Sequence, residues 1–267
     1  MAELNYERRG PAASPGPSTL VLIHGIGSRW QMWEPVLDRL AAECDVVALD
    51  LPGFGFSPPL PPGTESTPGA LAEAVGAFLG GLGVSRPHLA GNSLGGWVAL
   101  EMARRDQARS VTALSPAGFA SRGEGVLSRA SLRLSYGVAR WIRADAARLS
   151  RHVWFRNMAY GQMVHRPSHV SSYDVAESIR ALADSPGFTN TLAATTGARF
   201  RLGRPLEVPV TIAWGEHDRL LLPRQAQRAA AEIPNARIVP LPGCGHIPTY
   251  DDPELVARVV LEGRSPN

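Results

Sequence analysis

A serine, a histidine and an aspartate that lie far apart in this chain are of the types that together perform acyl transfer. Ser93 lies in Gly91-Asn92-Ser93-Leu94-Gly95, which has the form Gly-x-Ser-x-Gly. An apolar strand is predicted before this segment and a helix directly after it, and in that context a serine hydroxyl stands exposed as a nucleophile. The two glycines suit a tight turn in which backbone segments pass close together. Ser93 is therefore the predicted nucleophile.

A serine hydroxyl needs a base, and the base needs an acid that orients it. His246 lies in the glycine-rich segment 243–248, after the last predicted strand. Asp218 follows an apolar strand that ends at Trp214, and the chain order serine, aspartate, histidine is the order that this kind of turn requires. Glu216 is the alternative acid in the same segment, and we favour Asp218.

The tetrahedral intermediate of acyl transfer needs two backbone N–H donors. Leu94 directly follows the nucleophile, and Ile26 follows His24-Gly25 at the end of an earlier apolar strand. We predict that the N–H groups of Leu94 and Ile26 form this oxyanion hole. His24 is expected to support the loop rather than to transfer protons.

The elements that must position these residues alternate between strands and helices. Strands are predicted at 19–23, 45–49, 88–90, 110–114, 208–214 and 236–239, with a short extended segment at 4–8; helices are predicted at 33–42, 69–82, 94–104, 223–232 and 253–261. Such alternation is typical of a mostly parallel central sheet flanked by helices, an α/β fold. A Pro/Gly/Ser stretch at 10–18 predicts a loop.

The alternation stops at about Gly118. Between 125 and 202 only helical spacing is found, with apolar residues such as Leu127, Leu134 and Trp141 recurring along it. We therefore predict an α/β core formed by residues 1–118 and 205–267, with a helical insertion at 119–204.

The composition excludes several kinds of chemistry. All 27 basic residues are arginine, so Schiff-base lysine chemistry and the phosphate-binding Gly-Lys-Ser/Thr loop are excluded. Cys44 and Cys244 have no zinc spacing, and no metal site is expected. No apolar run approaches the roughly 18 residues that cross a bilayer, and no secretory signal is recognised, so a cytoplasmic location is expected.

The charge is uneven along the chain. Residues 119–204 hold thirteen arginines and five acidic residues, whereas the whole chain has a net charge of only +3. A basic segment of this kind could attract an anionic substrate or a membrane surface. The interpretation that we favour is a set of amphipathic helices with arginine-rich outer faces. No nucleic-acid-binding motif accompanies the arginines, so no nucleic-acid partner is expected, and the sequence does not specify an oligomeric state.

Together these motifs resemble the α/β-hydrolase fold superfamily, in its serine hydrolase branch. The resemblance rests on five segments, which are His24-Gly25-Ile26-Gly27, 50–57, 91–96, 215–218 and Gly245-His246. It implies a cofactor-free enzyme with a helical cap inserted after the sixth strand, and residues 119–204 match the position of that cap. The chain departs from the family pattern before Thr19, where one strand is found instead of two.

The resemblance implies a carboxylesterase-like enzyme that cleaves esters of small to medium substrates through an acyl-enzyme. Trp30, Phe54 and Trp97 are candidates for lining the substrate pocket, with core packing as the alternative for Phe54 and Trp97. A carbon–carbon bond hydrolase of a vinylogous diketone ring-fission product remains open. The segment Gly-Asn-Ser is typical of that branch of the fold, and the substrates of that branch are anionic. Acyl transfer to an acceptor other than water, and a non-catalytic ligand-binding protein on the same fold, also remain open.

Overall fold

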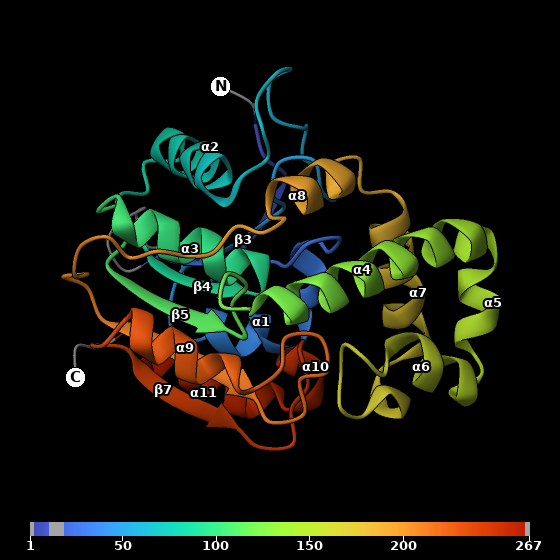
Figure 1. Cartoon of the computed structure of the whole chain (residues 1–267). Coiled ribbons are helices and arrows are strands. Elements are labelled where there is room, and N and C mark those ends of the chain that lie inside the picture. The colour runs from blue at the N-terminus through green and yellow to red at the C-terminus, as the bar shows by residue number, and fades with distance from the viewer. Residues whose placement is uncertain (1–2, 11–18, 265–267) are drawn as a thin grey trace.

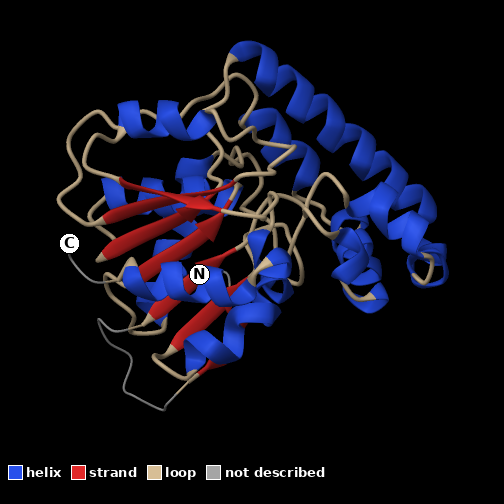
Figure 2. Cartoon of the chain, turned by 90° about the horizontal axis from the view of Figure 1, so that it is seen from below, coloured by secondary structure: helices blue, strands red, loops and turns tan. Residues whose placement is uncertain are grey.

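A computed structural model of the chain describes residues 3–10 and 19–264. Its seven described strands form one sheet in the order β1-β3-β2-β4-β5-β6-β7, in which β1 is antiparallel to β3 and every other neighbouring pair is parallel (Figures 1 and 2). The strands are β1 (Tyr6–Arg9), β2 (Leu20–Ile23), β3 (Val46–Leu49), β4 (His88–Asn92), β5 (Ser110–Leu114), β6 (Val210–Gly215) and β7 (Arg237–Leu241). The expected α/β architecture is confirmed.

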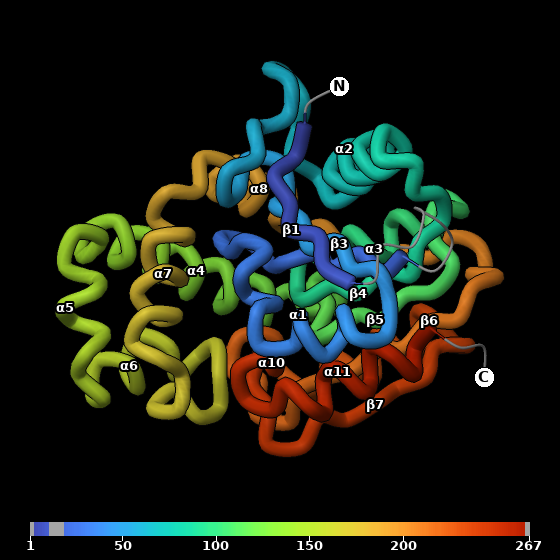
Figure 3. Tube along the Cα trace, turned by 180° about the vertical axis from the view of Figure 1, so that it is seen from behind, coloured from blue at the N-terminus to red at the C-terminus, as the bar shows by residue number. Residues whose placement is uncertain are grey.

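The sheet lies between two layers of helices, and alternate residues of each strand serve one layer or the other. Val21 and Ile23 pack with one layer, whereas Leu20 and Leu22 pack with the other. The first layer holds α2 (Pro68–Gly81), α3 (Leu94–Arg104) and α9 (Gln225–Glu232), and the second holds α1 (Glu34–Ala41) and α11 (Pro253–Glu262) (Figure 3). Burial on both faces explains why the parallel strands are uninterrupted apolar runs.

The segment between β5 and β6 is helical, as expected. It contains α4 (Arg122–Ile142), α5 (Ala146–Ser150), α6 (Val153–Tyr160), α7 (Ser172–Ala183) and α8 (Phe188–Ala194), with short 3-10 turns at Arg143–Asp145 and Pro167–His169. Figure 1 shows α4 to α7 extending beyond one end of the sheet. These four helices share an apolar core of their own, whereas Phe188 and Leu192 of α8 pack into the core beside α2 and α3.

The element boundaries differ from the sequence predictions in a few places. A 3-10 turn at Trp30–Trp33 precedes α1, and the one-turn helix α10 (Pro248–Asp251) precedes α11; neither was expected. The insertion follows β5, the fifth described strand rather than the sixth, because one described strand precedes β2. Residues 11–18, where a loop is predicted, lie outside the described residues.

The order of the strands reverses direction at β2, since β3 lies on one side of β2 and β4 on the other. The crevice beyond the carboxyl ends of strands at such a reversal is where α/β proteins place their sites. Ile23 at the end of β2 pairs with Gly91 in β4, so the loops that follow these two strands are neighbours. Those loops carry Ile26 and Ser93.

The start of α3 passes so closely over the end of β2 that only glycine fits at its second position. A Cβ added at Gly95 would fall on the carbonyl oxygens of Ile23 and His24. We therefore expect Gly95→Ala to lower the free energy of unfolding by roughly 1–3 kcal/mol or more, measured by urea denaturation. Gly80→Ala in α2 is the control, because its Cβ meets open space and a helical alanine is favoured by about 0.5–1 kcal/mol. An unchanged midpoint for Gly95→Ala would contradict the close approach.

Candidate active site

Ser93 is held in a strained backbone conformation between β4 and α3. Its φ is +56° and its ψ is −115°, outside the regions that residues with a side chain normally occupy. The backbone N–H of Ser93 donates to Leu114 O at 3.0 Å, and its carbonyl accepts from the N–H groups of Trp97 (3.1 Å) and Ala117 (3.0 Å). Such strain persists only where the surrounding contacts hold it, and it is common at functional residues.

Asp218 and His246 form a buried hydrogen-bonded pair. His246 Nδ1 lies 2.8 Å from Asp218 Oδ2, and Asp218 Oδ1 accepts from the N–H groups of Leu220 (2.9 Å) and Leu221 (2.8 Å). The carboxylate thus has partners on both oxygens, and Nδ1–H donates to it, which leaves Nε2 free to accept a proton. Glu216, the alternative acid, is exposed to solvent. The geometry therefore favours Asp218.

Asn92, the residue before Ser93, connects the end of β4 to the His246 loop. Its side-chain Nδ2 donates to His246 O at 2.8 Å and to Leu114 O at 3.1 Å. The structure contains no hydrogen bond between the Ser93 hydroxyl and the His246 ring, although both residues are described. The structure thus joins Asp218 and His246 by a direct hydrogen bond. Ser93 is connected to this pair only through its neighbour Asn92, which binds the backbone of His246. Catalytic hydrogen bonds are often long before substrate binds.

Asp251 in α10 holds the His246 loop against the inserted helices. Its carboxylate accepts from the N–H groups of Gly245 (2.8 Å), His165 (2.9 Å) and Arg166 (2.9 Å). The N–H of Ile247 also donates to Met163 O, at 2.7 Å. The predicted base is therefore flanked on both sides by contacts with the segment that follows α6.

Sequence reasoning missed Asp251. The neighbouring Asp252 has the expected role of an aspartate before a proline, because it caps α11 by accepting from the Leu255 N–H at 2.9 Å. In the sequence, Asp251 is indistinguishable from an ordinary polar residue of the turn before α11. Two of its three partners are backbone amides about 85 positions earlier in the chain, and no sequence signal identifies them.

His24 fixes the loop that carries the predicted oxyanion donor Ile26. Its ring Nε2 accepts from the Leu51 N–H at 2.9 Å, so its Nδ1 carries the proton that is donated to Gly25 O at 2.7 Å. Burial lowers the pKa of His24, which keeps the ring neutral. Because the peptide is planar and trans, the Ile26 N–H points away from the carbonyl that His24 holds. This is the supporting role that the sequence predicts for His24.

A cavity of about 620 Å³ opens from Ser93 to the surface between the core and the inserted helices. Ile26, Ser93 and Leu94 all line it. Its buried walls are largely apolar and include Trp97, Leu192, Leu220 and Leu221, whereas its exposed rim carries Arg122, Arg199 and Arg201. The cavity thus combines an apolar interior with a basic mouth.

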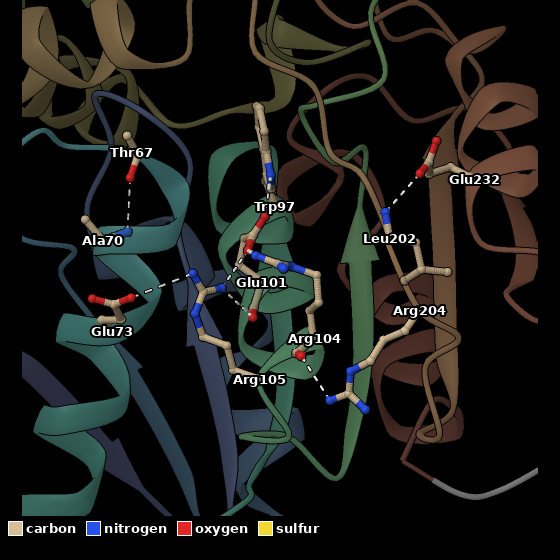
Figure 4. A network of polar contacts seen from close by, with 10 residues as sticks. All are labelled: Thr67, Ala70, Glu73, Trp97, Glu101, Arg104, Arg105, Leu202, Arg204 and Glu232. Carbon is tan, nitrogen blue, oxygen red and sulfur yellow. Dashed lines mark hydrogen bonds and ion pairs between the residues drawn. The ribbon is translucent and has the colours of Figure 1, made fainter.

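Of the three residues predicted to line the pocket, only Trp97 does so. Figure 4 shows its indole N–H directed at Glu101 of the same helix, at 3.4 Å, and Glu101 in turn pairs with Arg104 and Arg105. This network holds the ring in place while one side of it remains available to the cavity.

Phe54 does not line the cavity, and the alternative of core packing holds in this structure. Its ring is fully buried and packs edge-on against His24, at 5.7 Å between ring centroids, because the glycine-rich segment folds back onto the core. Trp30 does not line the cavity either. It packs beside the core of α1 and α11, and its backbone N–H donates to Asp50 Oδ1 at 2.7 Å.

Within residues 3–10 and 19–264, no group of three or more His, Cys, Asp or Glu side chains could hold a metal ion. Over the same residues, no helix is both long and apolar enough to cross a membrane.

Comparison with known proteins agrees with the fold. A sequence model described as the alpha/beta hydrolase family matches residues 20–259. The chain belongs to the alpha/beta hydrolase family. Among solved structures of this family's fold, a thermophilic esterase from Thermogutta terrifontis superposes with a TM-score of 0.73 at 23% identity, over 97% of this chain and 92% of the esterase. The family is one of hydrolases, and this chain is a hydrolase of that family.

Relatives within the alpha/beta hydrolase family have different chemistries. An uncharacterised protein of Mycobacterium tuberculosis is 30% identical over 96% of this chain and 77% of its own length. A 2-hydroxy-6-oxononadienedioate/2-hydroxy-6-oxononatrienedioate hydrolase of a Pseudomonas species is 26% identical over 97% of this chain and 92% of its own length. An epoxide hydrolase of Mycobacterium tuberculosis is 30% identical over 71% of this chain and 91% of its own length.

We expect Asp251→Asn to loosen the His246 loop. An amide can present only one oxygen, so at least one of the three N–H donors loses its acceptor, at a cost of about 1–3 kcal/mol. Hydrogen exchange should become faster at Gly245, His165 and Arg166. Asp252→Asn is the matched control, since asparagine caps a helix as well as aspartate does. Equal exchange in the two variants would contradict a positioning role for Asp251.

Proposed function

We propose that this chain is a serine hydrolase that cleaves carboxylic esters of small to medium substrates. The observation that carries this proposal is the position of Ser93, strained at the turn after β4 and open to a cavity lined by Ile26 and Leu94. The buried Asp218–His246 pair, tethered through Asn92 to the same turn, supports it.

In the proposed mechanism His246 Nε2 takes the proton from the Ser93 hydroxyl as its oxygen attacks the ester carbonyl. The N–H groups of Ile26 and Leu94 donate to the oxygen that becomes negatively charged, and each such donor is worth roughly 10²–10³ in rate. The imidazolium then protonates the leaving alcohol, and an acyl-enzyme remains on Ser93. Water activated by His246 releases the acid.

Asp218 acts on this cycle through His246. It accepts from Nδ1–H, which presents Nε2 to the serine, and its negative charge stabilises the imidazolium that forms twice in each turnover. Its own orientation is fixed by the N–H groups of Leu220 and Leu221, which also line the cavity. No cofactor takes part in these steps.

We further propose that residues 119–204 form a cap over the site. The separate apolar core of α4 to α7 supports this division, and so does the cavity wall, which combines the start of α4 with the segment after α8. A volume of about 620 Å³ suits a small to medium substrate. The state of the two cysteines, both free and buried, supports a cytoplasmic location.

The similarity to an epoxide hydrolase does not extend to the proposed nucleophile. Epoxide hydrolases of this fold use an aspartate there to form an alkyl-enzyme ester, and a serine cannot supply the carboxylate. Carbon–carbon bond hydrolysis is the second candidate function. The Pseudomonas relative and the basic mouth favour it, because ring-fission products are anionic. Arg122 and Arg199 supply the charge there, since Arg201 is paired with Glu232.

Ser93→Ala should lower hydrolysis of p-nitrophenyl butyrate by roughly 10³-fold or more. It should also abolish labelling by a fluorophosphonate probe, because the probe reacts only with an activated serine. Ser128→Ala is the matched control, since Ser128 lines the same cavity and its hydroxyl donates to Gly125 O in α4. Equal labelling of wild type and Ser93→Ala would remove Ser93 from the mechanism, and an unlabelled wild type would favour a ligand-binding protein.

The two enzymatic candidates can be separated with a coloured ring-fission product. We expect the specificity constant for simple esters to exceed that for this diketone, because the buried part of the cavity is apolar. The measurement is the loss of the product's visible absorbance, run beside ester hydrolysis with the same enzyme preparation. Faster consumption of the diketone would replace the ester proposal by the carbon–carbon one.

A further inference from the structure

The long helix α4 exposes a row of large apolar side chains to solvent. Val126, Leu127, Leu134, Val138 and Trp141 are between 44% and 84% exposed. The rest of the helix supplies Ala139 and Ile142 to the core of the inserted helices, and Leu132 and Tyr136 to the core beside α2 and α3. An amphipathic helix normally buries its more apolar side, so the outer face of α4 requires an explanation.

These exposed residues form one continuous face. Between Val126 and Trp141, at 100° per residue, they fall with Ala130 and Gly137 in a sector about 120° wide that contains no charged residue. The face runs along the helix from Val126, at the rim of the cavity, to Trp141, near its far end. We call these seven residues the outer face of α4.

A row of arginines borders the outer face on one side. By the same helical geometry, Arg122, Arg129, Arg133 and Arg140 fall within about 40° of one another. None of the four forms a salt bridge with a described residue, and Arg140 lies over the Tyr136 ring of the same helix. The single acid of α4, Glu124, is buried and paired with Arg224 and Arg228 of the core. The exposed surface of α4 therefore carries cations and no anion.

We propose that the outer face of α4 docks on an anionic lipid surface. Leucine, valine and tryptophan side chains enter the boundary between headgroups and acyl chains, and the guanidinium groups of the arginine row contact lipid phosphates. A second copy of this chain fits less well. The outer face and its border contain no carboxylate with which the arginines of a symmetry-related helix could pair.

Docking in this orientation has a consequence for the cavity. Arg122, Arg129 and Val126 belong both to the surface just described and to the rim of the cavity that contains Ser93. The mouth of the cavity therefore lies at the edge of the lipid-facing surface. An apolar substrate dissolved in the lipid reaches the apolar interior without crossing bulk water.

The test is co-sedimentation of the full chain with vesicles, in a Ser93→Ala background so that binding is independent of the proposed catalysis. We expect binding to phosphatidylcholine vesicles that contain phosphatidylglycerol, weakening as salt is raised, and much less binding to phosphatidylcholine alone. The double variant Leu134→Glu/Trp141→Glu should abolish binding. The double variant Arg133→Gln/Arg140→Gln should weaken binding by about 30-fold.

Each pair of substitutions has a control. Arg39→Gln/Arg258→Gln removes the same charge from α1 and α11 and should leave binding unchanged. Phe56→Glu adds a charge at an exposed aromatic outside the inserted helices. Unchanged thermal melting, and unchanged Ser93 labelling in variants that retain the serine, show that the variants fold. Absence of binding, equal loss in the controls, or a dimer in light scattering that Trp141→Glu dissociates would each overturn the proposal.

Discussion

The site depends on the close approach of the turn between β4 and α3 to the end of β2. A Cβ at Gly91 would meet the carbonyl of Gly95, and a Cβ at Gly95 would meet the carbonyl of Ile23. Because both side chains are absent, α3 can begin directly over the sheet with Ser93 in a conformation that costs about 1–3 kcal/mol. The same approach brings Leu94 beside the loop that carries Ile26, so the proposed nucleophile and the proposed oxyanion donors are positioned by one contact.

The acid–base half of the site depends on different contacts. Asn92 fixes the backbone of His246 from the sheet side, and Asp251 fixes the adjacent Gly245 to the segment after α6. The inserted helices therefore hold the proposed base as well as cover the cavity. The pairing of Glu124 with Arg224 and Arg228 anchors the start of α4 to α9 in the core. The inserted helices are thus bonded both to the His246 loop and to the start of α9.

Much of this arrangement could be predicted from the sequence because its signals are local. Buried parallel strands appear as short aliphatic runs, and a serine between glycines after such a run marks a turn whose function follows from its shape. Asp251 could not be predicted, because its partners are backbone amides, which every residue has. For Phe54 the sequence left pocket lining and core packing open, because a glycine-rich segment does not specify its fold, and here the chain folds back and buries the ring against His24.

The helix α4 shows a further limit of sequence periodicity. The spacing of Leu127, Leu134, Val138 and Trp141 predicts an apolar stripe, but it does not say what the stripe contacts. The helix packs instead through a second side that carries Leu132, Tyr136 and Ala139, and this leaves the outer face of α4 exposed. An apolar stripe that is not buried in the chain's own core fits the proposed contact with lipid. The arginines beside the stripe are then part of the same lipid-binding face of α4, rather than basic residues without a role.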